Sequence, residues 1–183
     1  MKIYQSLQKR SLKNTLILAT AAMMLLTSAI PTGPVAVNFS GEWKLNEQKS
    51  ELGEFGERFA PKKLKVDSKG DSMSCERTIT SQSGEDVTSI IKLTFDGKET
   101  ESIAFGNSKR KSTAKWSDDG QSLLINSTIF FDQNGQTNEI KVNEIWKLTD
   151  NGNSLAIESN SSSSFGDNSM KLVYENDVLI VFL

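Results

Sequence analysis

The stretch Phe39-Ser40-Gly41-Glu42-Trp43-Lys44-Leu45 decides the fold class of this chain of 183 residues. Every second residue from Phe39 onward is apolar or glycine, whereas Glu42 and Lys44 between them are charged. Successive side chains of a β-strand point to opposite faces. This period of two therefore predicts a strand with one buried face and one face in water.

The same alternation recurs along the rest of the chain. In two of the longer stretches, the residues predicted to face inward are Val87, Ser89, Ile91, Leu93 and Phe95, and Ile140, Val142, Trp146 and Leu148. Turn signals rich in Gly, Asn and Asp, such as Asp96-Gly97 and Asn134-Gly135, separate the stretches. These residue types tolerate the positive φ angles of tight hairpins, so each signal predicts a reversal of the chain.

Ten strands are predicted in this way. They lie near residues 39–46, 62–68, 72–81, 86–95, 99–105, 110–117, 121–131, 137–149, 154–160 and 168–176. Consecutive hairpins without intervening helices indicate an antiparallel up-and-down meander. Because closure of the sheet removes its exposed edges, the sequence predicts an all-β barrel, with eight to ten strands as the range that hairpin counting allows.

Three segments fall outside this rhythm. We expect Glu47 to Pro61 to form a short helix or lid, packed through Leu52, Phe55 and Phe59. The stretch from Ser159 to Ser164 is predicted to be a loop because of its Asn and Ser content. The last six residues, 178–183, are all apolar and would form one more strand or, if exposed, an aggregation hazard.

Composition excludes several classes of chemistry. The chain has no His, which is the commonest general base and metal ligand, and its one Cys cannot form an internal disulfide or a zinc cluster. Cys75 is predicted to be a small buried residue. Carboxylate pairs remain for acid–base work, but the acidic clusters lie at predicted turns. We therefore predict a protein that is not an enzyme, with no catalytic residues, no metal and no cofactor.

The first 29 residues predict export. Lys2, Lys9, Arg10 and Lys13 are basic, Thr15 to Leu26 is an uncharged and mostly apolar run, and Thr27-Ser28-Ala29 is small. This order is typical of a secretory signal, and the apolar run is shorter than the roughly 20 residues that span a bilayer. We expect a signal peptide over 1–29, a linker over 30–37 and a barrel domain over 38–183. The protein would then be periplasmic or extracellular, with no membrane span after cleavage.

The mature domain would be acidic, since cleavage removes four basic residues and no acidic ones. Nucleic acids and anionic lipid surfaces bind through Lys and Arg, so an acidic domain argues against nucleic acid as a partner. The basic run Lys109-Arg110-Lys111 lacks interleaved aromatic residues and is predicted to be a solvated turn.

The first strand also carries a family motif. Residues Asn38-Phe39-Ser40-Gly41-Glu42-Trp43-Lys44-Leu45 resemble the Phe-x-Gly-x-Trp-Lys-Leu opening of the calycin superfamily, which includes lipocalins and fatty-acid-binding proteins. With the strand rhythm over residues 38–176, the chain resembles the lipocalin-like proteins that many bacteria secrete. The resemblance implies a calycin barrel whose structural motif is Gly41 and Trp43, with Trp43 closing one end.

Two departures from these families matter. Lipocalins place an Arg late in the barrel against the Gly-x-Trp tryptophan, but the last Arg here is Arg110, so only Lys171 is left to substitute for it. Fatty-acid-binding proteins end in Arg-x-Tyr, and the matching residues here are Leu172 and Tyr174. The resemblance therefore supports the fold and leaves a fatty-acid ligand in doubt.

Two charged residues break the apolar phase. Arg77 shares its phase with Cys75 and Ile79, and Glu144 shares its phase with Val142 and Trp146. A buried charge is costly unless it is paired. Our hypothesis is that both point into the barrel, where they pair with each other or Arg77 holds an anionic head group. The alternative is a β-bulge that shifts the phase and puts either residue in solvent.

The predicted function is binding of a small apolar molecule or lipid inside the barrel. The candidate cavity residues are Arg77, Ile91, Leu93, Trp116, Val142, Glu144, Trp146 and Tyr174, with a packed core as the other role for the tryptophans. The alternative function is a cell-envelope structural or interaction module with a packed barrel core.

Overall fold

The computed structural model describes residues 37–54, 56–81 and 83–177, and these form one antiparallel sheet of ten strands. The strands are β1 (Gly41–Leu45), β2 (Lys63–Lys69), β3 (Ser72–Thr80), β4 (Asp86–Thr94), β5 (Thr100–Ile103), β6 (Lys109–Trp116), β7 (Ser122–Gln133), β8 (Gln136–Thr149), β9 (Ser154–Ser163) and β10 (Gly166–Asn176). Their order in the sheet is β4-β3-β2-β1-β10-β9-β8-β7-β6-β5. The chain thus meanders, and its first and last strands pair.

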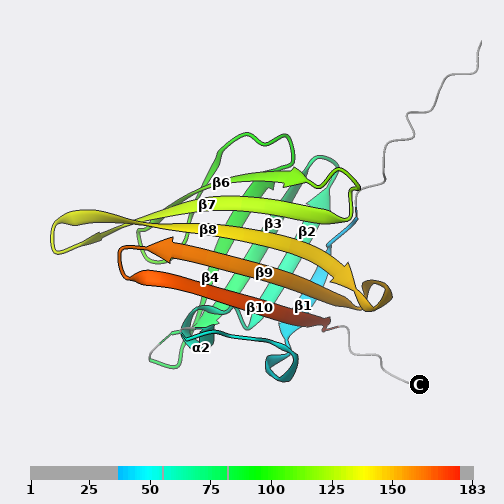
Figure 1. The fold of residues 1–183 in the computed structure, drawn as a ribbon, viewed down its shortest axis with the longest axis horizontal. Helices are drawn as coiled ribbons and strands as arrows, with labels where there is room; N and C mark the ends of the chain where they lie inside the picture. The colour runs from blue at the N-terminus through cyan, green and yellow to red at the C-terminus, as the bar shows by residue number, and fades with distance from the viewer. Residues whose placement is uncertain (1–36, 55, 82, 178–183) are drawn as a thin grey trace, which may run out of the picture. The chain divides into compact units, whose positions relative to one another are not determined.

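The sheet curls into a nearly closed barrel (Figure 1). Its two end strands, β4 and β5, lie side by side, and Thr100 Oγ1 donates a hydrogen bond to the carbonyl oxygen of Lys92 at 2.7 Å. Within the described residues no ladder joins these two strands. The predicted fold class, an up-and-down antiparallel meander barrel of eight to ten strands, is confirmed with ten.

Local turn chemistry explains the register. Asn134 and Gly135 both have positive φ, at 53° and 75°, and they connect Gln133 to its partner Gln136 as a two-residue hairpin loop. Positive φ at both central positions matches the right-handed twist of the strands. The predicted turn at Asn134-Gly135 is therefore confirmed.

One end of the barrel is filled by packed aromatic side chains, and we call it the closed end. Phe39 is fully buried there and stacks on Trp116 at 5.6 Å between ring centroids, with Trp146 edge-on at 6.0 Å. The turns over 69–72, 95–99, 117–121 and 149–154 lie at this end, as the strand bounds require. The opposite end carries the turns over 81–85, 104–108, 133–136 and 163–166 and the segment 46–62, and we call it the open end.

The Gly-x-Trp pair has a local role at the closed end. Trp43 is buried, and its Nε1 donates a hydrogen bond to the carbonyl oxygen of Phe39 at 3.0 Å. Gly41 has a φ of 153°, and a Cβ there would lie 3.3 Å from Trp43 Nε1. Lys171 does not substitute for the missing arginine, because it is exposed and pairs with Glu51 on the outer face.

Three expectations need correction. The stretch Ser159 to Ser164 is not a loop, since Ser159 to Ser163 pair with β8 on one side and β10 on the other. The segment 47–61 does contain short helices, η2 (Glu47–Lys49) and α2 (Gly56–Phe59), and Leu52 packs against the core as expected. Phe59, however, is 57% exposed rather than packed, and Phe55 lies outside the described residues. The strands β1 and β5 are shorter than predicted, and β9 is longer.

Two predicted segments lie outside the described residues: the signal peptide with most of the linker, and the apolar tail 178–183. Among the helices that the structure does describe, none has the length and apolar character needed to cross a bilayer.

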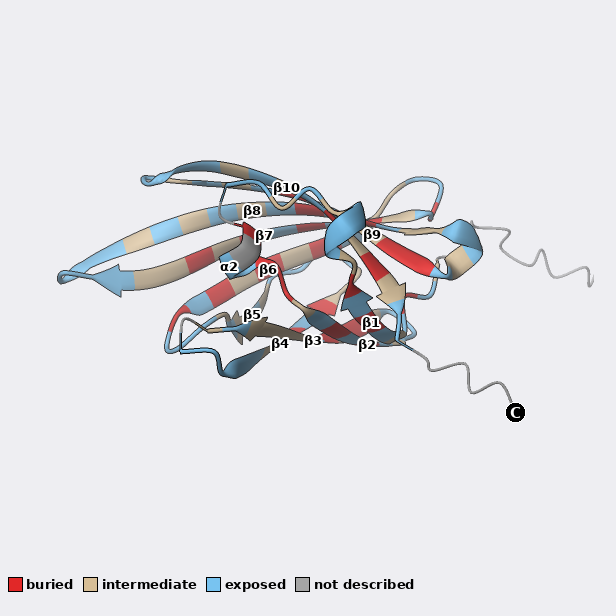
Figure 2. Ribbon diagram, turned by 90° about the horizontal axis from the view of Figure 1, so that it is seen from below, coloured by how far each residue is buried: buried red, intermediate tan, exposed pale blue. Residues whose placement is uncertain are grey.

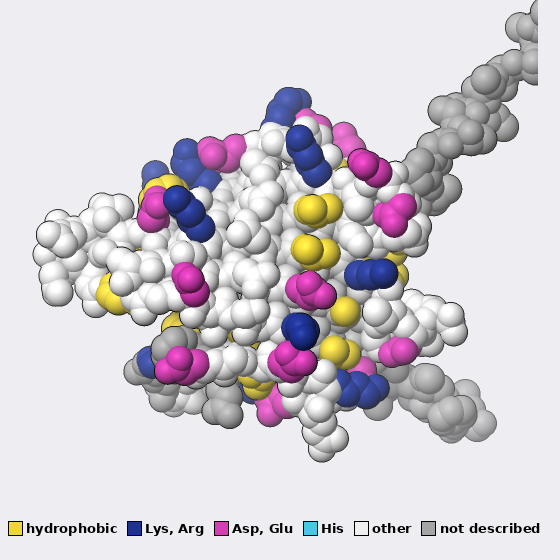
Figure 3. Space-filling view, in the orientation of Figure 1, with side chains coloured by type: hydrophobic (Ala, Val, Ile, Leu, Met, Phe, Trp, Pro, Cys, Tyr) yellow, Lys and Arg dark blue, Asp and Glu magenta, His cyan; other side chains and the backbone are white. Residues whose placement is uncertain are grey.

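The outer face is mixed in character. One cross-strand row on β6 to β10 reads Lys115, Leu124, Ile145, Glu158 and Lys171. Figure 3 shows the hydrophobic side chains on this face as small groups among charged side chains and uncharged atoms. This face therefore offers little continuous apolar surface.

Candidate functional site

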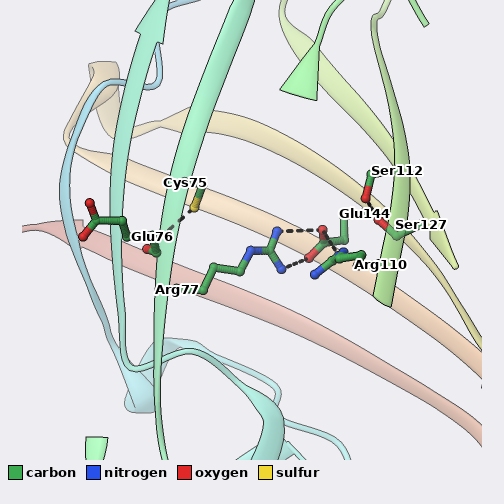
Figure 4. Close-up of polar contacts among 7 residues, drawn as sticks. All are labelled: Cys75, Glu76, Arg77, Arg110, Ser112, Ser127 and Glu144. Carbon is green, nitrogen blue, oxygen red and sulfur yellow. Dashed lines mark hydrogen bonds and ion pairs between the residues drawn. The ribbon is translucent and has the colours of Figure 1, made fainter. Parts of the chain in front are cut away.

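Three charged side chains meet inside the barrel (Figure 4). Arg77 donates from both terminal nitrogens to Glu144, with Nη1 to Oε1 at 2.9 Å and Nη2 to Oε2 at 2.8 Å. Arg110 lies on the other side of the same carboxylate, with Nη2 3.4 Å from Oε2. The exposed fractions of the side chains of Arg77, Arg110 and Glu144 are 11%, 7% and 5%. We call these three residues the charged triad.

Regular strand pairing aims the triad inward. Arg77 on β3 pairs with Leu64 and Ser89, and Glu144 on β8 pairs with Ile125 and Ser159, without a break in register. The bulge alternative is therefore wrong, and the predicted inward pairing of Arg77 with Glu144 is confirmed. The Arg77 guanidinium also lies over the Trp146 ring, 5.4 Å from its centroid.

Arg77 and Glu144 stabilise each other's charged form. Burial alone would raise the pKa of Glu144, but attraction to Arg77 and Arg110 and the hydrogen bonds from Arg77 lower that pKa below its usual range. Burial alone would lower the pKa of Arg77, but Glu144 more than offsets this and raises that pKa. Both groups are therefore charged at neutral pH, and the fork of Arg77 is already occupied.

Arg110 is the residue that sequence reasoning missed. It was expected in a solvated turn, but β6 begins at Lys109, and Arg110 points inward while Lys109 is exposed. The basic composition of the run suggested solvent. The available signal was its phase, because Arg110 lies an even number of residues from the inward-facing Ala114 and Trp116.

The environment of Arg110 is unfavourable to its charge. Burial and repulsion from Arg77 lower the pKa of Arg110 to about 10, although Glu144 acts in the opposite direction. The Nε atoms of Arg110 and Arg77 are buried and have no hydrogen-bond partner among the described residues. Because Arg77 engages Glu144 through two short bonds, Arg110 is the poorly partnered cation of the two.

Buried serine side chains extend the polar region around the charged triad, and we call them the serine layer. Ser112 and Ser127 are buried and share a hydrogen bond of 2.8 Å between their hydroxyl oxygens. Ser159, which pairs with Glu144, is also buried. These hydroxyls and the triad lie between the apolar core at the closed end and the open end.

Burial falls along the strands towards the open end. On β8 the inward residues Trp146 and Glu144 are buried, whereas Val142 and Ile140 are only half-buried. On β3 the inward residues Met73 and Cys75 are buried, but Ile79 is half-buried. On β4 Ile91 and Leu93 are buried, whereas Val87 is 42% exposed. Figure 2 shows the same change on β7 and β8, from buried segments to the exposed tip of their hairpin. Solvent therefore reaches the inward face of the strands near the open end.

The predicted cavity residues divide between these zones. Ile91, Leu93, Trp146 and Tyr174 belong to the packed core, with Trp116 partly buried against it. Tyr174 donates its hydroxyl to the Pro61 carbonyl oxygen at 3.0 Å, and burial raises its pKa. Arg77 and Glu144 lie in the triad, and Val142 lies on its open side. Contact of any of these residues with a ligand stays a prediction.

Other candidate sites are weaker. Cys75 is buried, as predicted, and burial raises its pKa to about 11, so its thiolate is disfavoured. A surface cleft of about 400 Å³ lies between β8 and β9 and includes Thr137, Glu139, Lys141 and Ser162. None of the predicted cavity residues lines it. The part of the chain that is described contains no cluster of acidic or cysteine side chains suited to a metal ion.

No protein-family model matches the sequence, and no curated protein matches it. A similar solved structure is that of zebrafish ileal bile acid-binding protein complexed with cholic acid, with a TM-score of 0.46 and 18% sequence identity. The likeness covers 75% of this chain and 98% of that chain.

Proposed function

We propose that this protein is a non-enzymatic, lipocalin-like barrel that binds a small apolar molecule in the open half of its interior. One observation supports the proposal above all others: inward-facing apolar residues lose their burial towards the open end. Ile79, Ile140 and Val142 face inward yet are only half-buried. In a barrel with a packed interior they would be covered by other side chains, so a bound apolar molecule would supply the missing cover.

The closed end limits where such a ligand would lie. Phe39 and the tryptophans fill that half, and the charged triad with its serine layer forms a polar floor above them. A ligand would therefore enter from the open end and stop at this floor.

We also propose that the protein is exported from a bacterial cell and works in the periplasm or outside the cell. The basic, apolar and small-residue order of residues 1–29 supports this, as does the resemblance to secreted lipocalin-like proteins.

Native mass spectrometry of the protein, made from the full coding sequence in an exporting host and purified without detergent, tests the binding function. We expect a discrete additional mass that disappears on denaturation. A clean ligand-free mass, with no binding of apolar fluorescent probes, would contradict the proposal.

The competing function is an envelope module that acts through its surface. The observation in its favour is a set of aromatic residues at the open end, where Phe105 and Phe165 are exposed and both contact Phe131. A clean mass combined with self-association or partner capture that depends on Phe105 and Phe165 would favour the module over the carrier.

A further inference from the structure

We propose that the rim of the open end binds a neutral oligosaccharide through the rings of Phe105, Phe131 and Phe165 and through the cleft between β8 and β9. We call these three residues the aromatic rim. The inference goes beyond the proposed function, because it concerns a second site at the edge of the barrel rather than its interior.

The aromatic rim brings together three separate parts of the chain. Phe105 lies in the loop after β5, Phe131 lies near the end of β7, and Phe165 lies in the turn between β9 and β10. The ring centroids of Phe105 and Phe131 are 6.3 Å apart, and those of Phe131 and Phe165 are 6.2 Å apart. Phe165 is 64% exposed and Phe105 is 42% exposed. Much of their ring surface is therefore open to a ligand.

The cleft adjoins the aromatic rim. Phe131 pairs across the sheet with Asn138, which lines the cleft, and Phe165 donates its backbone N–H to Ser163, which also lines it. The volume of the cleft is about 400 Å³, within the range of about 300–1,000 Å³ that small-molecule sites have. Amide and hydroxyl side chains supply most of its lining: Thr137, Asn138, Ser162, Ser163 and Ser164. These groups both donate and accept hydrogen bonds, as the hydroxyls of a sugar do.

The distribution of charge selects a neutral ligand. The two charged residues of the cleft, Glu139 and Lys141, pair with each other at 3.3 Å. The segments 104–108, 133–138 and 159–166 contain no charged residue, although 24% of the whole chain is charged. Figure 3 shows the projecting tip of the β7–β8 hairpin without charged side chains on the face in view. A charged ligand would lose hydration here without gaining an unpaired opposite charge.

A neutral saccharide matches both parts of this surface. The C–H groups on one side of a sugar ring pack on the electron-rich face of an aromatic ring, and its hydroxyls reach polar side chains beside that ring. An anionic membrane would require Lys and Arg near the aromatic residues, and a second copy of the chain would require a more continuous apolar surface. Because the three phenylalanines contact one another, they can pack on more than one sugar ring, which favours an oligosaccharide.

NMR titration of the full protein, labelled with ¹⁵N, tests the inference. The neutral probes are cellohexaose, maltohexaose, mannohexaose and N-acetylchitohexaose, and hexagalacturonate is the charged comparison. We expect at least one neutral probe to shift the backbone amides of residues 104–106, 131–138 and 162–166 in a saturable way. Hexagalacturonate should bind at least about fivefold more weakly than that probe.

Variants of Phe165 assign the binding to its ring. Phe165→Leu, which keeps an apolar side chain and loses the ring, should weaken binding about fivefold or more, whereas Phe165→Tyr should retain it. Phe59→Leu is the matched control, because Phe59 is similarly exposed but lies on α2, outside the aromatic rim. It should leave the affinity unchanged. Since both side chains are exposed, the thermal midpoints of all three variants should stay close to that of the wild type.

Three results would overturn the inference: no saturable shift with any neutral probe, binding that survives Phe165→Leu, or hexagalacturonate that binds as tightly as the neutral probe. Sedimentation with phosphatidylcholine vesicles and analytical ultracentrifugation identify other occupants. Vesicle binding or self-association that requires Phe165, without saccharide binding, would overturn the inference in favour of a membrane or a second copy. Each of these results leaves the proposed interior binding in place, because native mass spectrometry tests that function separately.

Discussion

At the residue scale, the three members of the charged triad contribute unequally to the stability of the folded protein. Arg77 and Glu144 satisfy each other's charge and hydrogen bonds, whereas the charge of Arg110 destabilises the folded protein. The pKa of Arg110 is lowered to about 10 in the folded protein. A base whose pKa is lowered by folding destabilises the folded state while it is charged.

Arg110→Met should therefore stabilise the ligand-free protein, by about 1–3 kcal/mol, since it replaces a poorly paired buried charge by an apolar group of similar length. Urea unfolding at pH 7 measures the change. A loss of stability would contradict this account, because it would mean that the charge of Arg110 is well paired in the folded protein.

Glu144→Gln should have the reverse effect, because it leaves two buried cations without a counter-charge. We expect a loss of about 3–5 kcal/mol in the free energy of unfolding. Combining Glu144→Gln with Arg110→Met should recover part of this loss, since only one cation then remains. The exposed Glu158→Gln, on the outer face of β9, is the control and should stay within about 0.5 kcal/mol of the wild type.

The effect of Glu144 should depend on pH. The pKa of Glu144 is lower in the folded protein than the usual pKa of a glutamate. Its contribution to the free energy of unfolding is therefore fully present at pH values above the usual glutamate pKa and is lost as the pH falls below it. The stability difference between the wild type and Glu144→Gln should therefore be constant between pH 6 and 8 and shrink in acid. Urea unfolding at a series of pH values checks this, and a difference that grows in acid would exclude the mechanism.

Gly41 is a second residue whose role is local. A Cβ at this position would meet the Trp43 indole, and the φ of 153° is strained for other residues. We expect Gly41→Ala to cost about 2–3 kcal/mol. Gly70→Ala is the control for backbone strain alone, because Gly70 has a φ of 60° with nothing within 4 Å of its Cβ position. Its expected cost is about 1 kcal/mol in the same unfolding measurement.

At the element scale, β9 shows how pairing overrides composition. Its last residues are Ser159 to Ser163 with Asn160, a composition typical of loops, yet they hydrogen-bond to strands on both sides. β-Propensity depends strongly on context, and two neighbouring strands supply that context here. The pairing is non-local, so the local sequence could not reveal it.

Ser161→Pro tests this assignment. Proline removes a ladder hydrogen bond from a strand that is paired on both sides, so we expect a loss of about 2 kcal/mol or more. Ser164→Pro, in the turn that follows, is the control and should be much milder. Equal effects in thermal unfolding would mean that this stretch behaves as a loop.

At the scale of the whole molecule, much of the fold was predictable because its signals are local. Alternation and turn residues predict ten strands, and the phase of Arg77 and Glu144 predicts their pairing. Arg110 was missed because a basic run is usually solvated, although its phase with Ala114 was visible. The burial gradient could not be predicted, because it depends on how far each strand extends past its neighbours.

The loss of burial towards the open end predicts which part of β8 unfolds locally most often. Backbone amides of β8 near Gln136 to Lys141 should exchange with solvent faster than those near Glu144 to Thr149, because fewer packed side chains cover them. Residue-resolved hydrogen exchange measures this. Uniform protection along β8 would contradict the division into closed and open ends.

The junction between β4 and β5 is the place where the width of the barrel can change. Elsewhere around the wall, ladders of backbone bonds hold neighbouring strands at a set spacing, but at this junction a hydroxyl of Thr100 spans to a carbonyl of Lys92. Widening the wall there costs about one side-chain hydrogen bond instead of a row of them. The barrel can therefore widen at this junction while the backbone ladders between the other neighbouring strands stay intact.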